Sequence, residues 1–415
     1  MSTLDSSNDL SQKRGVLPIN GDTAAILQLP DSDKKILAIN LGSLYCVARV
    51  NAELELDLSF GPDGNGYIED SFGDFGFPAA ATVSLQGDKL LIVGAYFDFF
   101  TSIDHLALAR YDLQGKVDTT FGDNGKVVVT LPEAGRRRLQ GRLRSGSNLQ
   151  ICRDPIVQAD GKILFFLLEV SDADPAGRAF LIRLTADGDL DDTFNGRGFQ
   201  HVTFGGYEIN PSGVQLQDDQ RILVYGGIQA GTQGTSTQNA VIARYDEQGG
   251  LDTTFNSTGF VTEGREGQVS RFTALLIDAN KRIVATGDDG NELLMVRRLD
   301  NGGIDPSFNK GLPAVIQLPV AVEILPTLQV QRGALVLAGT CYQRGTTTFR
   351  GLLLRLLPEG ELDTSFADGQ GFLVAEPASQ WFALAIESDD QIVTAGYVYD
   401  QNYRAWIQRV GIEGR

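Results

Sequence analysis

A five-residue motif, an aliphatic residue followed by Asp, any residue, Ser or Thr, and Phe, recurs through the whole sequence and constrains the fold more than any other feature. Its six copies begin at Leu56, Val117, Leu190, Leu251, Ile304 and Leu362. Successive copies of the Asp lie between 53 and 73 residues apart. A unit that recurs at such spacing indicates a repeat architecture in which each unit packs on its neighbours. We therefore expect a single domain over residues 1–415.

Each repeat contains four short segments rich in β-branched and aromatic residues, here called A, B, C and D. In the repeat that starts at Gly259 they are residues 260–262, 272–277, 282–286 and 292–298. A compact polar turn joins B to C, which is typical of a β-hairpin. Such turns occur seven times, at residues 31–33, 87–88, 160–161, 218–219, 278–281, 332–333 and 389–390.

The two ends of the chain explain why there are seven hairpins and only six full motifs. Residues 4–7 have the spacing of the motif, with Asn8 where Phe is expected, and residues 15–19 form an A segment. Residues 403–410 form a last D segment with nothing after it. We therefore predict an all-β fold, a seven-bladed β-propeller with four antiparallel strands per blade, whose ring closes across the N- and C-termini.

An arginine stands eight residues before the Asp of every full motif. The six pairs are Arg49 and Asp57, Arg110 and Asp118, Arg183 and Asp191, Arg244 and Asp252, Arg297 and Asp305, and Arg355 and Asp363. Arg409 has the same relation to the incomplete motif across the termini. A catalytic site needs a few unlike groups that converge on one point, whereas a ring needs the same contact at every joint. We interpret these pairs as structural, with each one joining strand D to its connection or to the next blade.

The motif phenylalanine is expected to fill the space between adjacent blades. A calcium loop is a second interpretation of Asp118, Asp123 and Asn124, although the spacing and terminal Glu of an EF-hand are absent. We predict no cofactor and no metal site, and the calcium alternative stays open.

The repeated pattern Leu-Asp-x-Ser/Thr-Phe-Gly/Asn-x-x-Gly, with its turn and its Arg-bearing strand, resembles the delta-60 repeat, a bacterial β-propeller family of largely unknown function. The resemblance spans nearly the whole chain. It implies the propeller fold and brings no catalytic residue. The sequence departs from the family pattern at Asn8, at Pro306 inside the fifth motif and in a long insertion at residues 131–155.

Charge and hydropathy limit the classes of partner. The formal net charge of −18 disfavours binding to nucleic acid or to an anionic membrane surface. The polar N-terminus lacks an apolar signal segment, and no apolar run has the length of a membrane span. We expect a protein of the cytoplasm, or one exported by a route that needs no signal peptide.

In a four-stranded meander, the A–B and C–D loops emerge on one face and the B–C and D–A loops on the other. Loop length varies on the first face, so we expect binding groups there. Five arginines of the A–B insertion could hold an acidic protein, an anionic glycan or a phosphate, or could contact the protein's own carboxylates instead. They are Arg136, Arg137, Arg138, Arg142 and Arg144. Four aromatic residues of one C–D loop could stack on a sugar or anchor a protein, or could cover the core of their blade. They are Tyr96, Phe97, Phe99 and Phe100.

These observations favour a non-enzymatic recognition or scaffold protein, a monomer that binds a protein or glycan partner through the variable loops. An enzyme acting on a carbohydrate or a lactone at the mouth of the central channel is the first alternative. The sequence holds two histidines, His105 and His201, and no Gly-x-Ser-x-Gly nucleophile motif. A component of an exported toxin or adhesion system is the second alternative, and it rests on analogy with other propellers.

Overall fold

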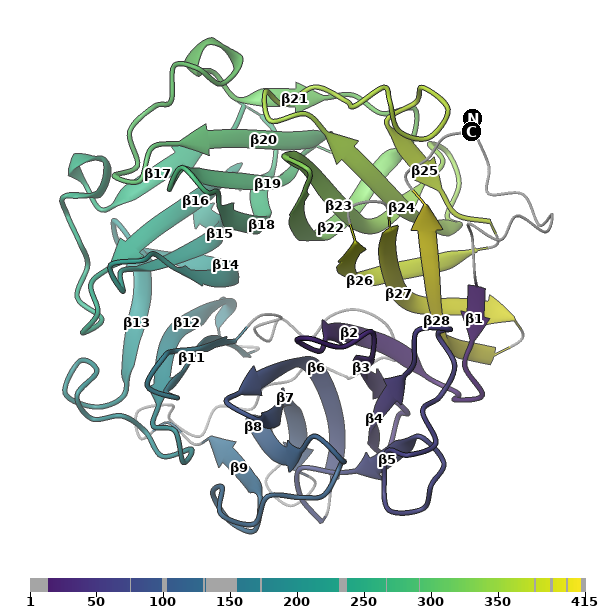
Figure 1. Ribbon diagram of the computed structural model, residues 1–415. Coiled ribbons are helices and arrows are strands. Elements are labelled where there is room, and N and C mark those ends of the chain that lie inside the picture. The colour runs from purple at the N-terminus through teal and green to yellow at the C-terminus, as the bar shows by residue number, and fades with distance from the viewer. Residues whose placement is uncertain are drawn as a thin grey trace.

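The computed structural model describes residues 14–411 except residues 75, 99–102, 130, 132–154, 172–173, 231–236, 266, 291, 377, 389–390 and 401. Strands dominate the described chain, and the two short 3-10 turns are Phe255–Ser257 and Asn309–Gly311. Figure 1 shows the strands in sheets that are set radially around a common axis. This arrangement is a β-propeller, so the predicted all-β propeller class is confirmed.

In the described part of the chain, the strands form five four-stranded sheets and one eight-stranded sheet, all antiparallel. One sheet holds β2 (Asp22–Gln28), β3 (Lys35–Asn40), β4 (Tyr45–Val50) and β5 (Tyr67–Asp70). The next sheet holds β6 (Gly76–Gln86), β7 (Lys89–Asp98), β8 (Ile103–Asp112) and β9 (Lys126–Val129). The eight-stranded sheet holds β10 (Ile156–Val157), β11 (Ile163–Ser171), β12 (Asp174–Leu184), β13 (Phe199–Phe204), β14 (Tyr207–Leu216), β15 (Ile222–Ala230), β16 (Thr237–Tyr245) and β17 (Phe260–Glu263). A further sheet holds β18 (Ser270–Ile277), β19 (Ile283–Asp289), β20 (Leu293–Arg298) and β21 (Ala314–Ile316). The sheet after it holds β22 (Ala321–Gln331), β23 (Ala334–Tyr342), β24 (Phe349–Leu356) and β25 (Phe372–Val374).

The remaining sheet joins the two ends of the described chain. It contains β26 (Ser379–Ser388), β27 (Gln391–Asp400), β28 (Asn402–Gly411) and, from the N-terminus, β1 (Arg14–Val16). Strand β1 pairs antiparallel with β28, with Arg14 opposite Gln408 and Val16 opposite Trp406. Backbone hydrogen bonds continue this contact, because Leu17 N donates to Ala405 O at 3.1 Å.

Segment B is the inner strand of each sheet, and segment A is the outer strand of the sheet before it. Strand β17, the A segment of the repeat at Gly259, pairs with β16 and belongs to the same sheet, while β18 begins the next sheet. The sheet boundary therefore falls between A and B, except where β13 pairs with β14, and not before A as the motif spacing alone suggested. The seven B–C hairpins expected from the polar turns are antiparallel strand pairs.

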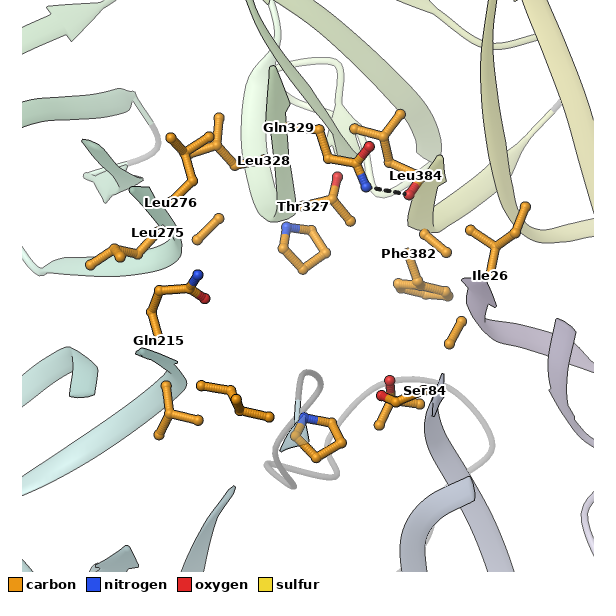
Figure 2. Close-up of a pocket in the computed structure, with 18 of the residues that line it drawn as sticks. Ile26, Ser84, Gln215, Leu275, Leu276, Thr327, Leu328, Gln329, Phe382 and Leu384 are labelled. Atoms are coloured by element: carbon orange, nitrogen blue, oxygen red, sulfur yellow. Dashed lines mark hydrogen bonds between the residues drawn. The ribbon is translucent and has the colours of Figure 1, made fainter. Parts of the chain in front are cut away.

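A β-bulge interrupts most inner strands at the same level. The strand register shifts in β2, β6, β14, β18, β22 and β26, for example between Trp381 and Ala383 in β26. A glycine in the neighbouring strand permits several of these bulges. A Cβ atom on Gly396 would lie 1.9 Å from Gln380 O, so only glycine fits opposite this bulge. The bulge turns Phe382 out of the strand alternation and toward the propeller axis (Figure 2).

The two faces of the propeller carry different kinds of connection. The D–A connections contain the repeated motif and lie with the B–C turns on one face, which we call the Arg-Asp face. The A–B and C–D connections lie on the other face, which we call the variable-loop face. The A–B connections on this face differ in length: the shortest is residues 205–206 and the longest is residues 130–155. No helix of the described residues is long and apolar enough to cross a membrane.

Candidate functional site

On the Arg-Asp face, each motif Asp forms an ion pair with the arginine eight residues before it. Arg183 Nε lies 2.7 Å from Asp191 Oδ2, and both side chains are about 5% exposed or less. The second oxygen, Oδ1, accepts from Thr193 Oγ1 at 2.6 Å. The other pairs lie 2.7 to 3.0 Å apart, at Arg49 and Asp57, Arg110 and Asp118, Arg244 and Asp252, Arg297 and Asp305, and Arg355 and Asp363.

The same arginines also reach the following repeat. Arg183 Nη1 donates to Glu247 O at 2.7 Å, and this carbonyl belongs to the turn before the next motif. Arg49, Arg110, Arg244 and Arg297 donate in the same way to Leu113 O, Ala186 O, Asp300 O and Pro358 O. One guanidinium therefore ties together its own strand, its own connection and the neighbouring repeat.

The motif phenylalanines pack beneath these arginines and against the next turn. Phe194 is fully buried, and its ring centre lies 4.7 Å from the guanidinium carbon of Arg183. A Cβ atom on Gly249, in the next turn, would lie 2.7 Å from Phe194 Cζ. The ring occupies the space between repeats, and the left-handed backbone of Gly249 (φ 88°) leaves room for it. Phe60, Phe121, Phe255, Phe308 and Phe366 are buried to the same extent.

Acid should weaken this face, because the motif carboxylates have lowered pKa values. Burial raises the pKa of Asp191, but hydrogen bonds from Thr193 and the charge of Arg183 outweigh burial and hold it below its usual range. The pKa values of Asp57, Asp118, Asp252 and Asp305 are lowered as well.

A carboxyl group with a lowered pKa in the folded state stabilises that state above its unfolded pKa of about 3.9, and this contribution is lost as pH falls through the folded pKa. We therefore expect the free energy of unfolding, measured by urea denaturation, to decrease steeply below about pH 4. An unchanged free energy between about pH 5 and about pH 2.5 would contradict this role of the carboxylates.

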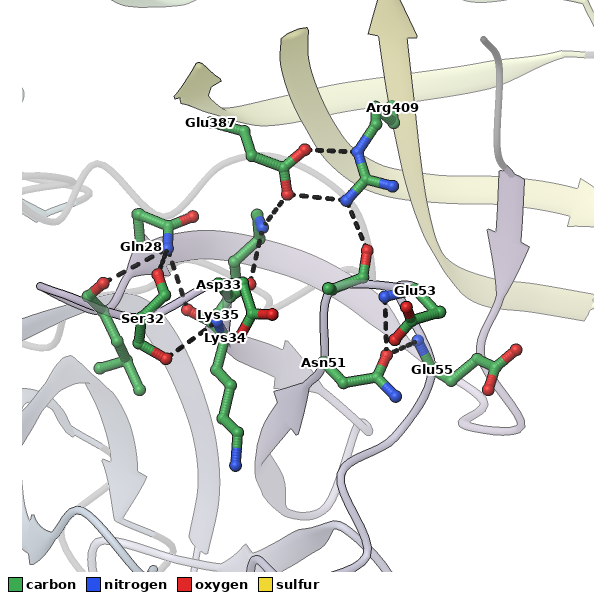
Figure 3. A network of polar contacts seen from close by, with 12 residues as sticks. Gln28, Ser32, Asp33, Lys34, Lys35, Asn51, Glu53, Glu55, Glu387 and Arg409 are labelled. Carbon is green, nitrogen blue, oxygen red and sulfur yellow. Dashed lines mark hydrogen bonds and ion pairs between the residues drawn. The ribbon is translucent and has the colours of Figure 1, made fainter. Parts of the chain in front are cut away.

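The contact between the last and first repeats uses different residues (Figure 3). Arg409 Nη2 donates to Ala52 O at 2.6 Å, in the first turn that is equivalent to the acceptor turns of the other repeats. Its guanidinium also pairs with Glu387, whose Oε1 lies 2.5 Å from Lys35 Nζ. Lys35 is fully buried at a level where the other sheets have Leu or Ile. Asp5, the partner that the motif spacing gave Arg409, lies outside the described residues.

A cavity of about 490 Å³ lies on the propeller axis, lined by residues of β2, β6, β10, β14, β18, β22 and β26 (Figure 2). Its wall is more polar than apolar: Leu275, Leu328 and Phe382 add apolar groups, and Gln215 and Gln329 add neutral polar groups. Gln329 Nε2 donates to Leu384 O at 3.0 Å across two inner strands. In the part of the chain that the structure describes, no carboxylate and no imidazole lines this cavity. Such a wall suits an uncharged group.

Beside the cavity, on the variable-loop face, tyrosines of β27 and β28 meet the start of β2. The ring centres of Tyr397 and Tyr403 lie 5.0 Å apart at 87°, and those of Tyr399 and Tyr403 lie 5.4 Å apart at 61°. Tyr399 and Tyr403 are 57% and 42% exposed. Burial raises the pKa of Tyr397 to about 12, and the neighbouring Tyr403 and Asp22 add to this shift. We call Asp22, Tyr397, Tyr399 and Tyr403 the seam tyrosine patch.

The residues that the sequence singled out for binding do not meet in one described site. All five loop arginines, Arg136, Arg137, Arg138, Arg142 and Arg144, lie outside the described residues, as do Phe99 and Phe100. Tyr96 is 7% exposed and packs in the core between the first two sheets, and Phe97 is half-buried in β7. For Tyr96 the core interpretation is therefore the better one.

The histidines and the calcium candidates are engaged within the fold. His201 Nε2 lies 3.0 Å from Glu208 Oε2, and its ring packs on Phe180. The two oxygens of Asp118 contact Arg110 and Thr120, and Asn124 donates to Asp123. Among the described residues, no three His, Cys, Asp or Glu side chains gather closely enough to hold a metal ion.

The repeated sheets, the repeated Arg-Asp contacts and the axial cavity define the class of the protein as a β-propeller. The family model described as "Domain of unknown function (DUF5122) beta-propeller" matches residues 86–121 and 158–194. The chain is thus similar to this family at two of its repeats, and the resemblance to the delta-60 repeat is confirmed. No curated protein sequence matches the chain.

Solved structures similar to this chain are also propellers. A catalytically inactive virginiamycin B lyase from Staphylococcus aureus with quinupristin has a TM-score of 0.50 and 10% identity, over 97% of this chain and 99% of that one. The Dos1 propeller has a TM-score of 0.47 and 10% identity, over 97% of this chain and 95% of that one. At 10% identity the likeness to the lyase structure supports the fold alone.

Proposed function

We propose that this protein is a non-enzymatic recognition or scaffold protein that binds a protein or glycan partner through its variable-loop face. The observation that supports this proposal is the separation of the two faces. The Arg-Asp face repeats the same ion pairs and turns from sheet to sheet, whereas connections of unequal length and exposed tyrosines gather on the other face. A rigid scaffold that presents divergent loops is a common basis for binding.

The proposed molecule is one seven-bladed domain over residues 1–415 and a monomer, whose ring closes between β1 and β28 without a metal or cofactor. Pairing of β13 with β14 links two four-stranded sets, β10 to β13 and β14 to β17, into the eight-stranded sheet. Counted in this way, the strands support seven blades. The contacts of Arg409 with Ala52 and of β1 with β28 support closure.

The enzyme alternative has less support. An active site at the channel mouth would need general acid and base groups near the cavity. The described cavity wall offers neutral amides and hydroxyls at Gln215, Gln329, Ser84 and Thr327. These groups can orient a ligand by hydrogen bonds, which suits binding better than proton transfer.

Site-specific photocrosslinking tests the proposed face. Benzoylphenylalanine would replace Tyr207 or Tyr399 on the variable-loop face, and Leu58 or Leu312 on the Arg-Asp face, since all four are at least 50% exposed. After irradiation in native lysate and culture medium, we expect adducts from the first pair of positions and none from the second. Adducts that form only from Leu58 and Leu312 would contradict the proposal, as would turnover of a sugar or lactone substrate.

A further inference from the structure

One carboxylate near the cavity mouth differs from the half-buried acids that form ion pairs in the fold. The motif carboxylates, Glu387, Asp288 and Asp289 each contact an arginine or a lysine. Asp22 is also half-buried, at the start of inner strand β2. Its polar side-chain contact among the described residues is the amide of Asn40, with Nδ2 at 3.4 Å from Asp22 Oδ2. A carboxylate kept from water without a cation is costly, so a cation would stabilise it there.

Three tyrosines lie on the strand hairpin next to this carboxylate, because the backbone N of the adjacent Gly21 donates to Tyr403 O at 3.1 Å. Tyr399 is opposite Tyr403 in the strand register and Tyr397 lies two residues away, so the three rings share one face of the β27–β28 hairpin. This is the face of Ala405 and Ile407, which pack in one core cluster with residues of β3 and β4. The nearby Arg404 is opposite Val398 and belongs to the other face of the sheet.

The ring geometry suits a cation better than a flat sugar. Tyr397 and Tyr403 pack edge to face at 87°, and the exposed rings of Tyr399 and Tyr403 meet at 61° instead of forming a continuous platform. Aromatic rings beside a carboxylate attract an ammonium or guanidinium group through their negative faces. The net charge of −18 also favours a cationic partner over an anionic one.

We propose that the seam tyrosine patch binds an arginine or lysine side chain from a basic segment of a protein partner. Asp22 supplies the charged hydrogen-bond acceptor, and the exposed rings of Tyr399 and Tyr403 pack on the aliphatic stem and the cationic group, while Tyr397 is buried and supports Tyr403. Phe382 connects the patch to the axial cavity, since its ring centre lies 5.9 Å from that of Tyr397. An uncharged side chain next to the basic one can therefore enter the cavity. This inference depends on the proposed function, because it specifies the partner of the variable-loop face.

Calorimetric titration with short capped peptides tests the inference. The probes are Gly-Arg-Gly-Arg-Gly and, as a neutral control, Gly-Gln-Gly-Gln-Gly. We expect the arginine peptide alone to bind the wild-type protein, and Asp22→Asn and Tyr403→Ala each to weaken it about tenfold or more. Asp22→Asn preserves the shape of the side chain, so its effect reports charge. The control variants Leu58→Ala and Asp218→Asn, both at exposed positions on the Arg-Asp face, should leave affinity within about twofold.

Three results would overturn the inference: no binding of the arginine peptide, equal binding of the glutamine peptide, or undiminished binding to Asp22→Asn. Binding of cellohexaose that is lost in Tyr403→Ala and kept in Asp22→Asn would assign the patch to a neutral glycan instead. Photocrosslinking distinguishes a failure of this inference from a failure of the proposed function. Adducts at Tyr207 with an inactive patch would preserve the variable-loop face as the binding face and reject only the patch.

Discussion

Replacing Asp191 with alanine is expected to lower the free energy of unfolding by about 3–5 kcal/mol, because the substitution leaves the buried Arg183 guanidinium without its counter-ion. Both side chains are about 5% exposed or less, and their atoms lie 2.7 Å apart. Arg183 would keep its hydrogen bonds to Glu247 O and Thr193 Oγ1, but these neutral acceptors do not balance its charge. Urea denaturation at neutral pH measures the change.

An exposed ion pair gives the matched control. Lys281 Nζ lies 3.3 Å from Asp218 Oδ2, and the two side chains are 67% and 77% exposed. Asp218→Ala should change the free energy of unfolding by no more than about 0.5 kcal/mol. Adding Arg183→Met to Asp191→Ala should recover part of the loss, since the unpaired charge is then gone. A loss below about 1 kcal/mol for Asp191→Ala alone would show that the pair does not hold neighbouring repeats together.

The repeated contacts of the fold could be predicted from the sequence, because they recur at constant spacing. Eight residues separate each Arg from its Asp, and this spacing spans the end of strand D and its following turn. The partner of the third guanidinium donor could not be predicted. It is a backbone carbonyl, such as Glu247 O, and any residue type can supply a carbonyl. Which segment forms the inner strand was likewise not predictable. The four segments of a repeat are similarly apolar, so a sheet could begin at segment A or at segment B.

The seam tyrosine patch could not be predicted because its parts are distant in sequence and unrepeated. Asp22 stands near the N-terminus and Tyr403 near the C-terminus, and the hydrogen bond from Gly21 N to Tyr403 O brings their strands together where the last sheet packs beside the first. One local signal was present. Tyr397 and Tyr399 alternate along β27, which places both rings on one side of the sheet. The loop arginines stay a prediction, since they lie outside the described residues, whereas the burial of Tyr96 shows that composition does not distinguish a buried ring from an exposed one.

Where the last repeat meets the first, Leu54 occupies the position that glycine holds in the other turns. Leu54 N donates to Asn51 O at 3.0 Å, as Gly249 N donates to Asp246 O in the equivalent turn. Gly115, Gly188, Gly302 and Gly360 make the same hydrogen bond, and all have positive φ. Leu54 keeps this left-handed conformation (φ 61°), which is unfavourable for a residue with a Cβ atom. Its side chain is 2% exposed and packs in a core cluster with Leu17, Ala405 and Ile407.

The other turn glycines leave room for a motif phenylalanine, and the sequence has Asn8 where this phenylalanine is absent. We infer that Leu54 fills this space from the opposite side. Leu54→Gly is therefore expected to destabilise the protein by about 2–4 kcal/mol, because the lost apolar packing exceeds the backbone strain that is relieved.

Thermal and urea denaturation measure this difference, and Asn8→Phe added to Leu54→Gly should recover part of it by restoring both residues of the repeat. A stabilised Leu54→Gly variant would contradict the inference. A stabilised variant is expected if the turn conformation alone determines stability at residue 54, since glycine is the residue best suited to positive φ.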